Sequence, residues 1–179
     1  MMNWRDWFSE IEKDFGFHKP ISWTEKISTV EEFLERYPND MQLRIRALYF
    51  LHNILVEEEY PIQSTEPMSY LLRKWFTEAN PKFAVSAEYL FFVGKRLFIA
   101  EWFFGLNDTT QAIVFQEKAH ILEPKRKLYK WAYYMAIGQE YQNLAKEILN
   151  NTEEIKWLKE RGFPGEYVLE QLYTSTEIN

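Results

Sequence analysis

The feature that most constrains the fold of this chain is a proline that returns at a nearly constant interval. Three prolines stand 43 residues apart and a fourth follows 40 residues after the third: Pro38, Pro81, Pro124 and Pro164. Proline ends one helix and is tolerated in the first turn of the next. Intervals of about 40 to 47 residues are typical of stacked helical hairpins. The interval therefore predicts an all-α fold built from paired helices.

The stretches on either side of each proline support this prediction. The expected first helices are 29–37, 70–79, 110–122 and 153–161, and the expected second helices are 41–56, 84–104, 128–137 and 166–173, with a further helix at 141–149. An apolar block also recurs nine to eleven residues after each of the first three prolines, at 47–49, 90–92 and 133–135. We predict one domain, 1–179, with an irregular N-terminal helical part at 1–27 and hairpin repeats over about 28–179. Its nine or ten helices would stack as a short solenoid.

Polar residues and glycines mark several expected helix ends. Ser28 and Thr29 are each followed by a glutamate three residues later, which predicts a helix start there. Asp40 and Asp108 are expected to cap the next helices, and Gly162 is expected to end one. The first helix is predicted from an apolar stripe at helical spacing: Trp4, Trp7, Phe8, Ile11 and Phe15.

Part of the chain resembles tetratricopeptide-type repeats. Ala112, Ala119 and Pro124 have the small–small–proline spacing of that family's second helix, and the segments 118–124 and 37–40 are similar to its closing phrase. The resemblance covers about 60 residues. It lacks the family's Trp and Gly in the first helix, and an interval of 43 residues exceeds that family's usual period. The likeness implies a stacked-hairpin scaffold and does not carry over a ligand pocket to this chain.

Charge and composition narrow the classes of function. The formal charge is −6, distributed as −6 over residues 1–68, +4 over 69–130 and −4 over 131–179. An acidic chain is a poor candidate for nucleic-acid binding and a plausible partner for a basic protein. The chain has no cysteine, so cysteine-ligated metals and disulfides are excluded. The start lacks an apolar secretory segment and the most apolar stretch, 83–104, carries four charges, so we expect a cytoplasmic protein without a membrane span.

The chain carries no recognisable catalytic or cofactor motif. The three histidines form no His-Glu-x-x-His pattern, and the six glycines form neither a nucleophile elbow nor a phosphate-binding loop. We expect His52 and His120 to be half-buried on helices and His18 to lie in an exposed loop. The sequence therefore predicts no catalytic residue, no metal ligand and no cofactor.

Two charge clusters have the wrong sign for their helix ends. Glu57, Glu58 and Glu59 end an expected helix, where the helix dipole favours cations. A basic cluster lies at the beginning of another expected helix, where the helix dipole favours anions: Lys125, Arg126, Lys127 and Lys130. Three interpretations remain open: a solvated rim, mutual neutralisation of the two clusters, or a surface for a charged partner.

The favoured hypothesis is a non-catalytic protein-binding module. In its acidity, size and aromatic content the chain is similar to bacterial immunity proteins, which bind and neutralise a basic toxin domain, often a nuclease. The predicted partner-binding residues are Glu57, Glu58, Glu59, Glu31, Glu32 and Glu35. The alternatives are an enzyme with an unrecognised helical site and a tetratricopeptide-like adaptor that binds an acidic peptide in its concave groove. The adaptor would use a basic centre that includes Arg73, Lys74, Lys95, Arg96 and 125–130.

Overall fold

All regular structure in the described part of the chain is helical. The computed structural model describes residues 3–16 and 22–177. The three short 3₁₀ helices are η1 (Glu12–Asp14), η2 (Ile62–Ser64) and η3 (Glu101–Phe104). The ten α-helices in these residues are α1 (Trp4–Ile11), α2 (Trp23–Arg36), α3 (Met41–Glu57), α4 (Thr65–Phe83), α5 (Ala87–Arg96), α6 (Thr110–Leu122), α7 (Lys127–Ala136), α8 (Gln142–Leu149), α9 (Thr152–Lys159) and α10 (Phe163–Glu177). The all-α prediction is confirmed.

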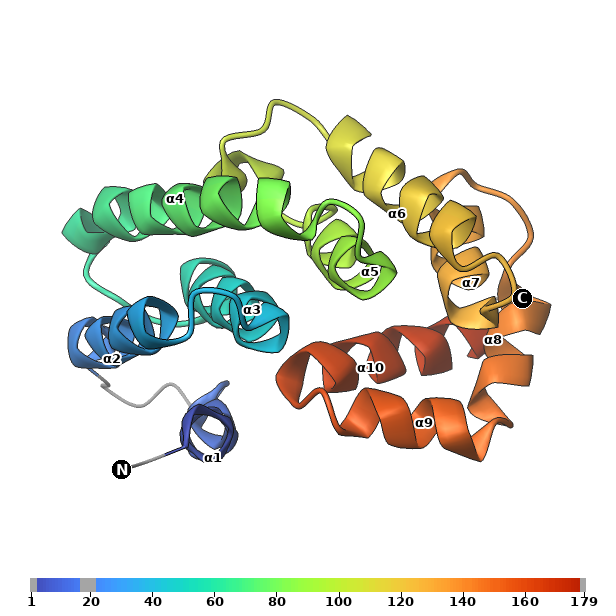
Figure 1. The fold of residues 1–179 in the computed structure, drawn as a ribbon, viewed down its shortest axis with the longest axis horizontal. Coiled ribbons are helices and arrows are strands. Elements are labelled where there is room, and N and C mark those ends of the chain that lie inside the picture. The colour runs from blue at the N-terminus through green and yellow to red at the C-terminus, as the bar shows by residue number, and fades with distance from the viewer. Residues whose placement is uncertain (1–2, 17–21, 178–179) are drawn as a thin grey trace.

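The helices form an outer arc with other helices inside it (Figure 1). In this view α2, α4 and α6 follow the outside of the arc, while α3 and α5 lie inside. The last helix, α10, starts beside the N-terminal part of the chain, runs away from it and packs against α8, α9 and α3. None of the described helices has the length and apolar composition that crossing a bilayer requires.

Several contacts join positions that lie one proline interval apart. The Tyr49 hydroxyl on α3 donates a hydrogen bond of 2.7 Å to the carbonyl of Phe92 on α5, 43 residues later. Arg96 on α5 donates at 3.3 Å to the side-chain oxygen of Asn53 on α3, again 43 residues away. The inner helices α3 and α5 therefore pack so that the apolar block at 47–49 contacts the equivalent block at 90–92.

Local capping predicted some helix ends correctly. The Asp40 carboxylate accepts from the backbone N–H of Leu43 at the start of α3, and that of Asp108 accepts from Thr110 at the start of α6. Gly162, with a φ of 63°, follows α9 in the left-handed conformation that favours glycine.

Several predicted boundaries are wrong. The helix expected at 70–79 spans Thr65–Phe83, so Pro81 lies inside α4 and does not separate two helices. The helix expected from residue 29 begins at Trp23, and the Thr29 hydroxyl donates to the carbonyl of Glu25 one turn back instead of capping. Because a threonine hydroxyl can bond a carbonyl inside a helix as well as an N–H at its start, the sequence pattern does not by itself distinguish the two positions. The stretch 84–104 is not one helix. Ser86 caps α5, which ends at Arg96, and Ala100 has a φ of 47° that a right-handed helix excludes.

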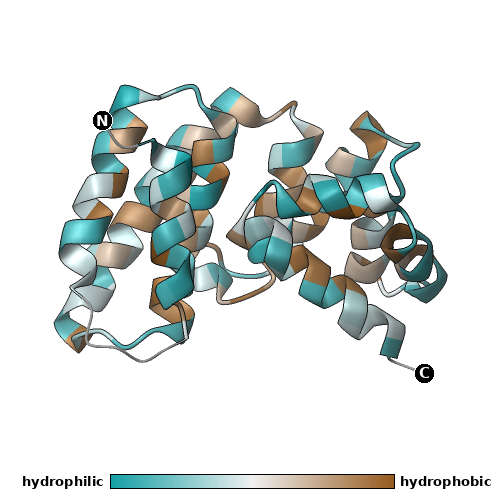
Figure 2. Cartoon of the chain, turned by 90° about the horizontal axis from the view of Figure 1, so that it is seen from below, coloured by the Kyte–Doolittle hydropathy of each residue, from teal (hydrophilic) through white to brown (hydrophobic). Residues whose placement is uncertain are grey.

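Aromatic side chains fill the space between the inner helices and α10. Tyr49 meets Tyr167 of α10 at a ring distance of 5.8 Å, and Phe92 stacks on Trp157 of α9 at 5.6 Å. Tyr49, Phe92 and Trp131 are fully buried. Hydrophilic and hydrophobic residues alternate along most of the helices (Figure 2), as amphipathic helices around a shared core require.

A buried ion pair links the N-terminal helix to the middle of the chain. The Glu12 carboxylate accepts from Arg46 of α3, with an Nε–Oε1 distance of 2.7 Å, and the two side chains are 9% and 8% exposed. The backbone N–H of Phe163, at the start of α10, donates to the same carboxylate. A Cβ at Gly162 would stand 2.6 Å from the central carbon of the Arg46 guanidinium, so a side chain there would displace the arginine.

Removal of the Glu12 carboxylate should be much more costly than removal of an exposed acid nearby. The Glu12→Ala variant leaves the Arg46 guanidinium buried without a counter-ion, and we expect it to lower the free energy of unfolding by about 3–5 kcal/mol. Glu10 pairs with Lys13 at the surface, so Glu10→Ala should cost about 0–1 kcal/mol. Urea unfolding followed by circular dichroism measures both changes. Equal losses would contradict a structural role for the buried pair.

Candidate partner-binding surface

The six predicted glutamates lie on the α2–α3 hairpin but not in one cluster. The indole N–H of Trp23, the first residue of α2, donates to the carbonyl of Glu59 at 3.2 Å. Glu59 therefore lies beside the start of α2. Glu35 is twelve residues further along that helix, which corresponds to about 18 Å. Because α2 and α3 run in opposite directions, Glu35 lies toward the other end of the hairpin from Glu57–Glu59 (Figure 1), whereas Glu31 lines the same groove as Trp23 and Tyr60. The predicted acids are therefore spread along the hairpin.

The three acids at the end of α3 differ in their surroundings. Glu58 is half-buried, and its carboxylate accepts from the backbone N–H of Gly16 at 2.8 Å, which gives it a structural role. Glu57 and Glu59 are exposed. The charge of Glu57 acts on buried Arg96, where it opposes the effect of burial, which lowers the pKa of that arginine. Glu57 and Glu59 therefore offer their carboxylates to solvent, whereas Glu58 does not.

The first part of the chain carries a surplus of carboxylates that make no ion pair with the described residues. Four bases are already paired with acids: Arg5 with Asp40, Lys13 with Glu10, Arg44 with Glu78 and Arg46 with Glu12. Two of the unpaired acids, Asp6 and Glu25, were missed by the sequence analysis, although Glu25 and Glu32 are seven residues apart and so share a helix face. The acids in this described region with neither an ion pair nor a side-chain hydrogen bond are Asp6, Glu25, Glu31, Glu32, Glu35, Glu57 and Glu59.

Most of the basic cluster at 125–130 is used inside the protein. Arg126 donates to Glu154 of α9 at 3.1 Å and covers the ring of Trp157 at 3.7 Å. Lys127 pairs with Glu147 of α8 at 2.8 Å, and Lys130 lies over the ring of Tyr134 at 5.1 Å. Lys125 is exposed.

These contacts join the start of α7 to α8 and α9, so the possibility that the cluster neutralises Glu57–Glu59 is wrong. Its acidic partners come from the C-terminal helices, which lie beside α7 in the folded chain.

The two bases at the end of α5 are buried. The Lys95 ammonium lies 4.4 Å from the ring centre of Trp131 and 3.2 Å from the sulfur of Met135, with no carboxylate bound among the described residues. Burial lowers the pKa of Lys95 to about 7. Arg96 lies between two tyrosine rings, at 5.4 Å from Tyr49 and 5.1 Å from Tyr167. The adaptor hypothesis requires both bases at the surface, but α7 and α10 cover them.

The histidines have structural surroundings where they are described. His52 is fully buried, deeper than predicted, and stacks on Phe104 at 4.9 Å. Burial, reinforced by the charge of Arg96, lowers its pKa to about 3 and keeps it neutral. His120 is half-buried, as predicted, and stacks on Tyr133 at 5.9 Å. His18 lies outside the described residues. The described part of the chain contains no cluster of three or more residues suited to bind a metal ion.

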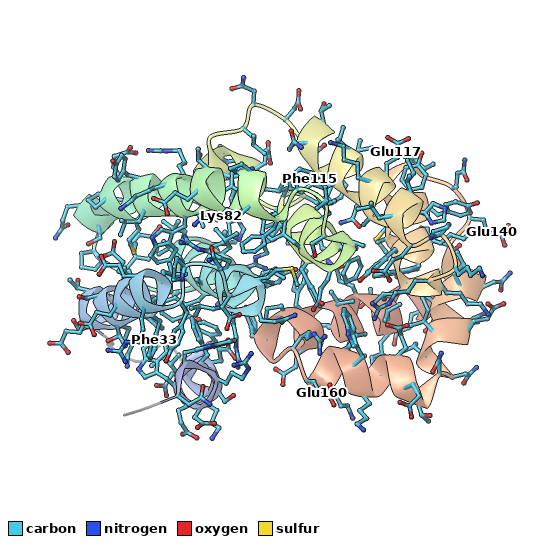
Figure 3. The ribbon with its side chains drawn as sticks, in the orientation of Figure 1. Phe33, Lys82, Phe115, Glu117, Glu140 and Glu160 are labelled. Carbon is cyan, nitrogen blue, oxygen red and sulfur yellow. The ribbon has the colours of Figure 1, made fainter. Side chains whose placement is uncertain are left out.

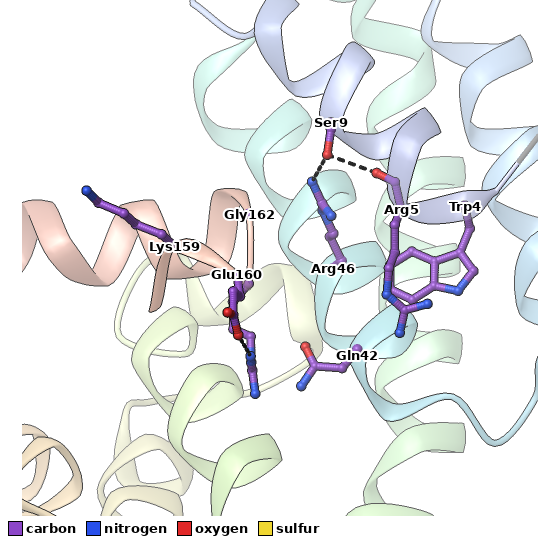
Figure 4. Close-up of a pocket in the computed structure, with 9 residues that line it drawn as sticks. Trp4, Arg5, Ser9, Gln42, Arg46, Lys159, Glu160 and Gly162 are labelled. Carbon is purple, nitrogen blue, oxygen red and sulfur yellow. Dashed lines mark hydrogen bonds and ion pairs between the residues drawn. The ribbon is translucent and has the colours of Figure 1, made fainter. Parts of the chain in front are cut away.

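A polar cleft of about 470 Å³ lies between α1, α3 and the turn before α10 (Figure 4). Its walls include Arg5, Arg46 and Arg161, each of which already has an acidic partner. Arg161 pairs with Glu88 at 2.7 Å, and Arg46 also donates to the hydroxyl of Ser9, a contact drawn in Figure 4. The three arginines of this cleft are therefore neutralised within the fold, at a junction between the N-terminal helices and the turn before α10.

No protein-family model, curated protein or solved structure gives a significant match to this chain. The functional argument therefore rests on the distribution of charge and apolar surface.

Replacement of Lys95 by methionine should stabilise the protein. Methionine fills a similar volume without burying a charge, and we expect the free energy of unfolding to rise by about 1–4 kcal/mol at pH 7 or below. Lys95 loses its proton near pH 7 in the folded chain and near about pH 10.4 in the unfolded chain. Between these values the unfolded chain binds the extra proton, so this lysine makes stability rise with pH in the wild type.

The Lys95→Met variant should lack that contribution to the rise. Urea unfolding from pH 6 to pH 10 measures the difference between wild type and variant, with Lys125→Met as the exposed control. A destabilised Lys95→Met variant would show that the ammonium has a compensating partner.

Proposed function

We propose that this protein is a non-catalytic binding module that recognises a basic protein partner through the α2–α3 hairpin. The observation that carries the proposal is that several bases are paired within the fold while many acids of the N-terminal region are not. Four bases of the N-terminal region pair with acids of the fold, and so do Arg126 and Lys127 of the 125–130 cluster. Seven acids of the N-terminal region make neither an ion pair nor a side-chain hydrogen bond with the described residues. Exposed charge of one sign raises the association rate of an oppositely charged partner.

The specific form that we propose is a bacterial immunity protein, acting in the cytoplasm on a basic toxin domain such as a nuclease. Support comes from the acidic surplus and from the buried aromatic contacts that fix α3 and α10 against each other. A rigid acidic surface suits tight inhibition because little conformational entropy is lost on binding.

We also propose that the architecture is a short helical-hairpin repeat of the tetratricopeptide or HEAT type. The contacts between α3 and α5 at a separation of 43 residues support it. A peptide-binding adaptor has less support, because α10 packs against the inner helix α3 and, through Tyr167, against Arg96 of α5.

Charge reversal at the end of α3 tests the proposed function. The Glu57→Lys/Glu59→Lys variant leaves Glu58 in place to accept from Gly16, and urea unfolding measures what the reversed charge near buried Arg96 costs in stability. We expect association with the partner, first captured from the native cell and then purified, to slow roughly tenfold or more at low salt. Stopped-flow kinetics at several salt concentrations measure the rate.

A control variant with the same change in net charge separates local from global effects. Glu140 and Glu177 are exposed, and Glu140 lies at the opposite side of the molecule from α2 (Figure 3). Glu140→Lys/Glu177→Lys should slow association much less than the α3 variant. An acidic partner, or an equal response to both variants, would argue against a binding surface on the α2–α3 hairpin.

A further inference from the structure

An apolar groove lies between α2 and α4, next to the acids of the proposed surface. Its volume is about 520 Å³. Trp23 and Ile27 line it from α2, Met68 and Leu71 line it from α4, and Tyr60 lies in the connection between α3 and α4. The groove is therefore bounded by two outer helices, beside the end of α3 where Glu57 and Glu59 stand.

The walls of the groove are held in place by the rest of the fold. Trp23, Ile27 and Met68 are 5%, 6% and 4% exposed, so each is packed on its other sides. The Trp23 indole is fixed by its hydrogen bond to the Glu59 carbonyl, and the Tyr60 hydroxyl donates to the carbonyl of Leu55 at 3.1 Å. A preformed hollow with tryptophan, tyrosine and methionine walls is suited to receive one large apolar side chain.

The charges around the groove select the partner. Glu31 is the charged residue among those that line it, and no lysine or arginine belongs to the lining. Glu59 is joined to Trp23, and Glu25 stands two residues after Trp23 on the same helix. These three acids make no ion pair with described residues. An apolar hollow with free carboxylates around it is complementary to an apolar side chain flanked by bases.

We infer that this groove anchors a large apolar side chain of the partner, and that lysine or arginine residues beside it in the partner meet Glu31 and Glu59. The inference rests on the proposed function and adds the chemistry of the partner's contact segment. Burial of the anchor supplies affinity, while the acids supply orientation and the rate of encounter.

Two synthetic peptides and a groove-filling variant test the inference. The probes are a lysine-rich peptide with one central tryptophan and the same peptide with alanine in its place. Ser28 lines the groove from an exposed position on α2, so Ser28→Trp fills it without disturbing the core. Thr24→Trp, at a second exposed lining position, repeats the test if the first variant folds poorly. Thr77→Trp, on an exposed position of α4 outside the lining, is the matched control.

Isothermal titration calorimetry at low salt should show the tryptophan peptide binding the wild type at least tenfold more tightly than the alanine peptide. Ser28→Trp should abolish this difference and leave the affinity for the alanine peptide unchanged, and Thr77→Trp should preserve it. Equal affinity of the wild type for both peptides, lost in Glu57→Lys/Glu59→Lys, would overturn the anchor and leave the proposed function standing. Failure of both peptides to bind the wild type would count against both.

Discussion

The buried pair of Glu12 and Arg46 is the contact on which the closed arrangement of this chain depends. It joins η1 to α3, and the N–H of Phe163 brings the start of α10 to the same carboxylate. Ions taken out of water must regain their lost hydration from partners in the protein. Here several groups share that task, with Ser9 completing the contacts of Arg46. The consequence is that the C-terminal hairpin is held against α3.

The position of α10 then decides which charges reach solvent. Arg96 would face outward if α3 and α5 stood alone, but α10 covers it and places Tyr167 over it. Lys95 is enclosed by α7 in the same way and lacks a carboxylate among the described residues. Burying such a cation is unfavourable, and the aromatic ring of Trp131 offsets only part of the cost. The central part of the chain is basic in composition, yet two of its bases are hidden.

In the acidic N-terminal part of the chain, by contrast, many of the charged side chains remain exposed to solvent. Four of its bases are paired within the fold, and the pair of Arg44 with Glu78 reaches a later helix. The carboxylates that are left lie on α2 and at the end of α3, near a groove with apolar walls. The combination of free acids with a preformed apolar hollow gives this surface more binding potential than the cleft in which Arg5 and Arg161 are neutralised within the fold.

Features that depend on near neighbours in the chain could be predicted well. Helical periodicity gave the all-α class, and the caps at Asp40 and Asp108 follow from side chains that reach backbone groups two or three residues away. Thr29 shows the limit of such patterns, because its hydroxyl can satisfy a carbonyl inside a helix as well as an N–H at its start. The acids of the candidate site were found largely because charge runs are visible in the sequence.

The tertiary structure alone decided which of those charges are free. Glu58 is held by the N–H of Gly16, 42 residues away, while Glu57 is exposed, and Arg126 is occupied because Glu154 of α9 lies beside it. The amino-acid order determines helices, their apolar faces and their caps, since these arise from interactions within a few residues. Pairing and burial of a charge depend on groups brought together by packing, and the groove between α2 and α4 exists only because α3 holds those two helices apart.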